Sequence, residues 1–199
     1  MEKISRRNQM DKNSRTFLYV MNTALELAIA AGAVVMFVIG KVTLARVMNQ
    51  VQPIWIQALC GTAAGLIIGI GCGLLVTKVK FFSPVLEIVG ELVKKYSLTL
   101  ADIAIISLTA AICEELLFRV ALQRVWGIWP TSVLFILLHG YFSVRNLKVI
   151  AYGAIMLLLS AAIGYSYQYL GLYAAVAFHF VFDLAALLIV RFSLMTQAK

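Results

Sequence analysis

The chain has 199 residues, of which 62% are hydrophobic and 13% are charged, and its mean hydropathy is +0.94. Soluble domains are usually about 45–50% apolar, so this composition excludes an ordinary soluble protein and predicts one embedded in a lipid bilayer. The net charge of +8 would suggest nucleic acid as the partner of a soluble chain. Here the basic residues lie between apolar segments, where they set membrane topology, and we expect no nucleic-acid partner.

Apolar windows that could cross a bilayer recur along the whole chain. A helical crossing needs about 20 apolar residues, and such windows fall at 17–40, 54–77, 98–122, 127–144, 147–166 and 172–192. The expected fold is all-α: a polytopic membrane helix bundle of about six transmembrane helices, in a single integral membrane domain over residues 1–199. Residues 1–97 would hold the first spans and a connector, and residues 98–192 the core that carries the chemistry.

The distribution of basic residues predicts the orientation of this bundle. If the N-terminus is cytoplasmic, only Lys41, Arg46 and Arg124 fall on the outer side. The inner side then collects Lys3, Arg6, Arg7, Lys12, Arg15, Lys78, Lys80, Lys94, Lys95, Arg145, Lys148, Arg191 and Lys199. The positive-inside rule therefore places both termini in the cytoplasm. The lack of further domains favours a prokaryotic plasma membrane.

Two segments of the N-terminal half have patterns of their own. The stretch 83–95 begins with Ser83, the expected N-cap, and Pro84 at the first helical position, and its apolar and charged residues fall on opposite faces. It is typical of an amphipathic helix on the inner membrane surface, or of a polar-faced connector packed on the bundle. In the second window, glycines recur every fourth residue and favour close helix packing: Gly61, Gly65, Gly69 and Gly73.

Ionisable residues inside apolar windows supply the functional signal, because charged groups in hydrocarbon usually face a partner or a functional cavity. The set comprises Glu26, Asp102, Glu114, Glu115, Arg119, His139, His179 and Asp183. Asp102 lies near the end of its window and could cap a helix, and Glu26 could hydrogen-bond between helices. The other six lie on three separate windows, and they include both histidines of the chain.

The spacing of these six residues indicates how they could work together. Glu115 and Arg119 are four residues apart on one helix face and can form an ion pair, which leaves Glu114 without a local partner. His179 and Asp183 share a face in the same way. A glutamate beside a histidine can activate water, and a second imidazole can stabilise an oxyanion, so peptide hydrolysis fits the inventory. Alternatively, Glu114, His139, His179 and Asp183 could hold zinc.

The stretches "EELLFR" (114–119), "FILLH" (135–139) and "HFVFD" (179–183) closely resemble, in this order, the three motifs of one membrane protease family. This is the CAAX protease and bacteriocin-processing (CPBP, or Abi) family, also known as type II CAAX prenyl endopeptidases. Its patterns run Glu-Glu-x-x-x-Arg, Phe-x-x-x-His and His-x-x-x-Asn/Asp. The resemblance covers roughly residues 98–192.

The resemblance implies an intramembrane endopeptidase, historically described as a metalloprotease and now usually as glutamate-dependent. By this likeness Glu114 and His139 would activate water, His179 and Asp183 would form the oxyanion side, and Glu115 and Arg119 would support them. The implied substrate is a membrane-anchored or membrane-proximal protein or peptide precursor. The implied cofactor is none, with zinc as the alternative.

Two other functions remain compatible with the sequence. A non-catalytic membrane scaffold or immunity protein could keep the same fold and bind a partner. A small proton-coupled transporter also uses buried carboxylates and histidines. One spatial feature counts against a joint site: measured from the predicted helix midpoints, Glu114 and His139 differ in depth by about 10 Å at 1.5 Å per residue.

Overall fold

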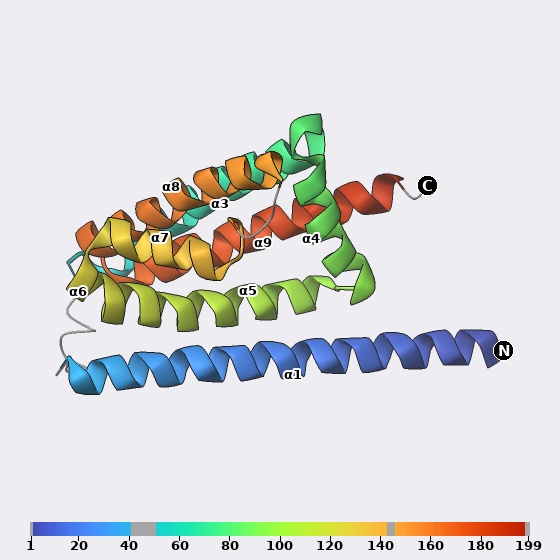
Figure 1. Cartoon of the computed structure of the whole chain (residues 1–199), viewed down its shortest axis with the longest axis horizontal. Coiled ribbons are helices and arrows are strands. Elements are labelled where there is room, and N and C mark those ends of the chain that lie inside the picture. The colour runs from blue at the N-terminus through green and yellow to red at the C-terminus, as the bar shows by residue number, and fades with distance from the viewer. Residues whose placement is uncertain (1, 41–50, 143–145, 198–199) are drawn as a thin grey trace.

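The computed structural model describes residues 2–40, 51–142 and 146–197, and these ranges contain helices and turns but no strand (Figure 1). The helices of the first half are α1 (Glu2–Ile39), α3 (Ile54–Lys78), the short 3₁₀ helix η1 (Lys80–Phe82) and α4 (Ser83–Lys95). Those of the second half are α5 (Leu100–Glu115), η2 (Leu116–Gln123), α6 (Arg124–Trp126), α7 (Ile128–Leu138), α8 (Leu147–Tyr169) and α9 (Leu172–Gln197). The expected all-α class is confirmed for the described part of the chain.

Among the described residues, four helices are long and apolar enough to cross a membrane: α1 from Arg15 onward, α3, α8 and α9. The count rises to five if α4 and the continuous helix Leu100–Trp126, which meet at 115°, form one bent span. The expected count of about six is not confirmed. In the described part of the window 127–144 the only helix is α7, with 11 residues, and it is about 17 Å long against a hydrocarbon core of about 30 Å.

Helix α9 lies at the centre of the bundle and contacts α3, α4, α5 and α8. Figure 1 shows α1 alongside α5 at one side of the molecule, with α3 and α8 at the other and α4 running across one end. Helix α7 packs between η2 and α8. The residues singled out in the second half of the chain lie on α5, η2 and α9 and in the turn that follows α7.

The glycines of α3 let its backbone press against α9. A Cβ added at Gly65 would lie 2.5 Å from the carbonyl oxygen of Phe178, and one at Gly69 would lie 2.7 Å from that of Phe182. Ordinary Cβ atoms do not approach another atom so closely, so any larger residue would push the two helices apart. The expected packing role is confirmed, and it fixes the segment of α9 that carries His179 and Asp183.

Helix α4 begins one residue earlier than the sequence pattern suggested. Ser83 is already helical (φ −53°, ψ −34°), and Phe82 is the N-cap, without a side-chain hydrogen bond. The reason is that the 3₁₀ turn η1 leads straight into α4, so the backbone has no extended residue at which Ser83 could cap. The apolar face of α4 is packed on the bundle through buried Val85 and Val93, as expected for a connector.

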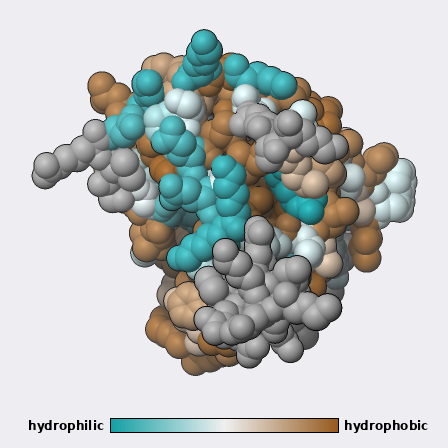
Figure 2. All heavy atoms as spheres, turned by 90° about the vertical axis from the view of Figure 1, so that its right-hand side faces the viewer, coloured by the Kyte–Doolittle hydropathy of each residue, from teal (hydrophilic) through white to brown (hydrophobic). Residues whose placement is uncertain are grey.

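Hydrophilic residues gather at the end of the bundle where α4 lies (Figure 2). Helix α1 begins and α9 ends at the same end as α4 (Figure 1), and hydrophilic residues gather on this end (Figure 2). The start of α1 and the end of α9 therefore lie at the same end of the bundle. That this end faces the cytoplasm stays a prediction from the charge distribution.

The glycine contacts of α3 predict a specific sensitivity to one methyl group. Gly65→Ala is expected to lower the unfolding free energy by about 1–3 kcal/mol, the usual cost of overpacking a tight contact. Gly71→Ala adds the same methyl group where no atom lies within 4 Å, and it should leave stability unchanged or slightly raised. Thermal unfolding of the two variants in the same detergent tests this, and equal melting temperatures would contradict the proposed close approach.

Candidate functional site

Glu114, Glu115 and Arg119 lie on one continuous helix, which is a regular α-helix in α5 and a π-helix in η2. It begins with a capping box between Thr99 and Asp102, whose carboxylate also binds the Arg15 guanidinium at 2.7 Å. Asp102 thus has the capping role that the sequence suggested. The π segment η2 begins at Leu116, directly after Glu115. Such segments are rare and occur frequently at functional sites, and nothing in the residue pattern had indicated one.

A tight turn at Gly127 brings Glu114 and His139 to the same depth. The helix from Leu100 continues to Trp126, the chain reverses at Gly127 with φ +82°, and α7 begins at Ile128. Glu114 lies 13 residues before this turn and His139 lies 12 residues after it, so the two arms of the hairpin are level. The expected 10 Å mismatch was wrong because the first arm extends four residues beyond its apolar window.

Arg119 is the centre of a buried polar network, although its side chain is 0% exposed. Its Nε donates to Glu115 Oε2 at 2.7 Å, which is the ion pair expected from the spacing. Its Nη2 donates to Ser160 Oγ of α8 at 3.0 Å, and its Nη1 donates to Gln123 Oε1 at 3.5 Å. Gln123 Nε2 in turn donates to the Gly164 carbonyl at 2.9 Å. The network therefore ties the π segment to α8.

Glu115 also binds His179, the histidine on α9. His179 Nδ1 lies 2.8 Å from Glu115 Oε1, and because a carboxylate only accepts, Nδ1 is the donor. The opposite nitrogen, Nε2, faces Asp183 Oδ2 at 3.4 Å and Glu114 Oε2 at 3.9 Å. Arg119, Glu115 and His179 thus form a continuous chain that sets the tautomer of the imidazole.

Glu114 lies between the two imidazoles. Its carboxylate atom Oε2 is 3.8 Å from His139 Nε2 and 3.9 Å from His179 Nε2. This atom is buried and has no hydrogen-bond partner in the part of the chain that the structure describes. His139 Nδ1 donates to the Phe135 carbonyl at 2.8 Å, so in the neutral ring Nε2 carries the lone pair that faces Glu114.

These side chains line a cavity of about 230 Å³ between α5, α7, α8 and α9. Glu114, His139, His179 and Asp183 all reach it, together with Tyr141 and otherwise mostly apolar residues. His139 stacks on Phe135, with ring centroids 4.2 Å apart, and its side chain is 36% exposed. A mostly apolar pocket with a few convergent polar groups is the usual form of a ligand site.

The predicted alternative zinc ligands were Glu114, His139, His179 and Asp183. Among the residues with described side chains, no group of three or more His, Cys, Asp or Glu residues could hold a metal ion. The Nδ1 atoms of both histidines are already committed, to Glu115 and to Phe135. The Nε2 atoms of both histidines still face carboxylates across the cavity, at 3.8 and 3.9 Å from Glu114 Oε2 and, for His179, at 3.4 Å from Asp183 Oδ2.

Three polar residues of the site escaped the sequence analysis. Ser160 and Gln123 bind the guanidinium of Arg119, and Tyr141 lines the cavity beside His139, with ring centroids 6.4 Å apart. A single small polar residue inside an apolar run is the signal that could have identified Ser160. Glu26, which the sequence had singled out, is buried on α1 and does not line the cavity.

A comparison with known protein families gives one match that covers these motifs. The model of the type II CAAX prenyl endopeptidase Rce1-like family matches residues 96–185, which confirms the resemblance stated from the motifs. No curated protein matches this chain. No solved structure matches it either.

The buried ion pair predicts a large cost when only one partner is removed. Arg119→Leu leaves the Glu115 carboxylate charged without its guanidinium partner, and it should lower the unfolding free energy by about 3–5 kcal/mol. Glu115→Gln combined with Arg119→Leu removes both charges, while the amide oxygen still accepts from His179, and should recover much of this loss. Thermal unfolding in detergent measures both variants, and a double variant less stable than Arg119→Leu would contradict the pairing.

Proposed function

Since the chain belongs, through residues 96–185, to the type II CAAX prenyl endopeptidase Rce1-like family of proteases, we propose that it is an intramembrane endopeptidase of the glutamate-dependent kind. It is an integral multi-pass membrane protein, in keeping with this family and with its four to five apolar helices. Its substrate would be a membrane-anchored or membrane-proximal protein or peptide precursor. The proposed setting is a prokaryotic plasma membrane with both termini inside.

The observation that carries the proposal is the buried Glu114 oxygen between two histidines. Its distances of 3.8 and 3.9 Å to the two Nε2 atoms are too long for direct hydrogen bonds. A water molecule in the adjoining cavity could bridge these atoms from the side, since water can link polar groups that lie beyond direct contact. The unpartnered Oε2 atom would accept one of its protons.

The reaction would proceed by general base and general acid catalysis. Glu114 removes a proton from the water as the water oxygen attacks the carbonyl carbon of the scissile peptide bond. His139, whose Nε2 lone pair faces the same position, orients this water. When the carbon–nitrogen bond breaks, protonated Glu114 returns the proton to the leaving amine, so the carboxylate is regenerated at the end of each cycle.

The oxyanion of the tetrahedral intermediate would be stabilised from α9. With its Nδ1 proton engaged by Glu115, His179 can donate from Nε2 only as the imidazolium. Glu115 on one side and Asp183 on the other compensate that positive charge, at 2.8 and 3.4 Å. An imidazolium held in a water-poor cavity is a strong electrostatic partner for a developing oxyanion.

Water would reach the site at the end of α7. Residues 139–142 form a turn instead of continuing the helix, and Tyr141 packs against Gly153, which lies inside α8. This turn therefore lies at membrane depth. Non-helical backbone at that depth is tolerated where it is buried in protein or lines a water-filled cavity, and His139 and Tyr141 line the cavity described above.

Removing the charge of Glu114 tests the role of the general base. Glu114→Gln keeps the shape of the side chain but cannot take the proton, so cleavage by the purified protein should fall by about 10²–10⁴-fold while the protein stays folded. The matched control is Glu87→Gln, on the exposed face of α4, which should cleave as the wild type does. The measurement is the rate of product formation from membrane peptides in detergent, followed by mass spectrometry.

A strong chelator in the same assay separates a water mechanism from a metal-dependent one. We expect wild-type cleavage to survive the chelator. Loss of cleavage that zinc restores would instead support the zinc alternative. Full activity of Glu114→Gln would refute the role given to this carboxylate.

Two substitutions of Asp183 test whether this residue helps His179 to stabilise the oxyanion. Asp183→Asn keeps an oxygen and adds N–H donors at the same position, and the family pattern accepts asparagine there, so cleavage should be retained within about 10-fold. Asp183→Ala removes the group that faces His179 Nε2 and should reduce kcat by about 10²-fold or more, with little change in KM. Wild-type rates in both variants would show that Asp183 has no part in the reaction.

A further inference from the structure

A second cavity, of about 170 Å³, adjoins the one that holds the candidate catalytic residues. It lies between α3, α4, α8 and α9, on the side of the site toward α4. The two cavities share four lining residues: Tyr141, Met156, Phe182 and Asp183. A substrate bound at Glu114 could therefore extend a group into the second cavity past Asp183.

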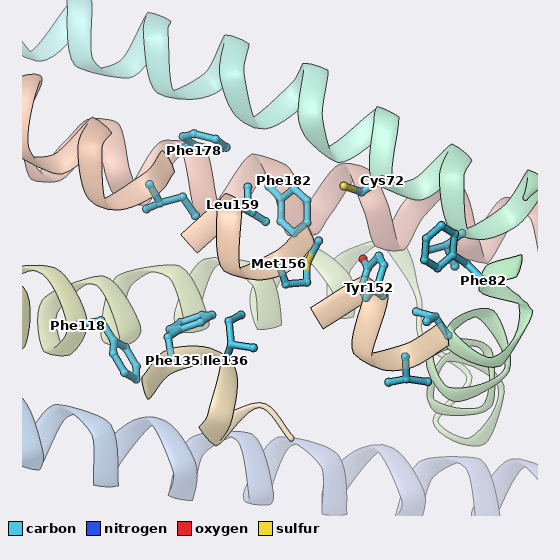
Figure 3. Close-up of a cluster of buried hydrophobic side chains, with 14 of the residues drawn as sticks. Cys72, Phe82, Phe118, Phe135, Ile136, Tyr152, Met156, Leu159, Phe178 and Phe182 are labelled. Carbon is cyan, nitrogen blue, oxygen red and sulfur yellow. The ribbon is translucent and has the colours of Figure 1, made fainter. Parts of the chain in front are cut away.

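The walls of this second cavity are almost wholly apolar. Val76 and Cys72 of α3, Val85 of α4 and Val190 of α9 line it and are buried. Figure 3 shows Cys72, Phe182, Met156 and Tyr152 gathered around this region. Asp183, at the border with the first cavity, is the only carboxylate among its lining residues, so the rest of the cavity provides contacts for an apolar group.

The volume limits the size of the group that can enter. A buried apolar cavity of about 150 Å³ takes up one benzene molecule, and the cavity here is only slightly larger. One aromatic ring or one branched aliphatic side chain therefore fits. A prenyl chain has more than twice as many carbon atoms as benzene and does not fit as a whole.

We propose that this second cavity is a specificity pocket that receives the apolar side chain of a single substrate residue next to the scissile bond. This inference rests on the proposed protease function, and it narrows the substrate class. The enzyme selects peptides with a residue such as leucine, methionine or phenylalanine at that position.

Filling the pocket tests the proposal. Ala186 of α9 lines the second cavity but not the first, and Ala186→Phe places a ring in it. The matched control is Ala63→Phe, the same change on an exposed position of α3. The substrates are unprenylated peptides of about 20 apolar residues, varied between alanine, leucine, phenylalanine and tryptophan at each position beside the cut that mass spectrometry identifies.

At one of the positions beside the cut, leucine or phenylalanine should give a kcat/KM about 10-fold or more above that of alanine, as is usual for apolar pockets. This preference is expected both for the wild type and for Ala63→Phe. Ala186→Phe should bring this ratio close to one or reverse it. Val76→Ala, which enlarges the pocket, should improve the relative cleavage of the tryptophan peptide. Thermal unfolding shows whether Ala186→Phe is folded. If it is not, the Val76→Ala variant still tests the pocket assignment.

The possible failures differ in what they overturn. Cleavage with a side-chain preference that neither pocket variant changes would overturn the pocket assignment and leave the protease function intact. Cleavage only of peptides carrying a farnesyl group, lost in Ala186→Phe, would overturn it in favour of a lipid occupant. No cleavage of any peptide by the wild type, prenylated or not, would contradict the protease function itself, and the pocket assignment with it.

Discussion

The arrangement of this protein depends on the burial of one permanent positive charge. Arg119 is 0% exposed and cannot lose its proton inside the membrane, so the surrounding helices must supply acceptors in the right places. Glu115 supplies the counter-charge, and Ser160 and Gln123 accept from the other guanidinium nitrogens. Because Glu115 also accepts from His179, satisfying this charge orients an imidazole of the site at the same time.

Local periodicity was enough to predict the pairs that lie on one helix. The four-residue spacings of Glu115 with Arg119 and of His179 with Asp183 give contacts of 2.7 and 3.4 Å in the structure, and the glycine repeat of α3 meets α9 as expected. The sequence also distinguished Glu114, which has no partner on its own helix, from Glu115. The spacing of residues along a single helix is enough to predict which side chains share a face, so these features could be read from the sequence.

Features that depend on more than one helix were missed or misplaced. The π segment after Glu115, which packs against α1, α7 and α8, was not indicated by any pattern of residue types. The depth of His139 was wrong because an apolar window does not reveal that the preceding helix runs on to Trp126 before the turn at Gly127. Ser160 was missed because a lone serine in an apolar helix gains meaning only from the guanidinium that it faces.

The shortness of α7 has a consequence for the surrounding lipid. Leu137 and Leu138, its last residues, are 54% and 68% exposed, so they face acyl chains about 17 Å from the start of the helix. Beyond them the bundle presents a turn instead of another helical face. Lipids beside α7 would have to shorten or tilt to end near the turn at which we propose that water enters, and such mismatch costs fractions of a kcal/mol per Å. Bilayer thickness would thus act directly on the wall of the cavity that contains His139, and membranes of different thickness would hold this histidine under different strain.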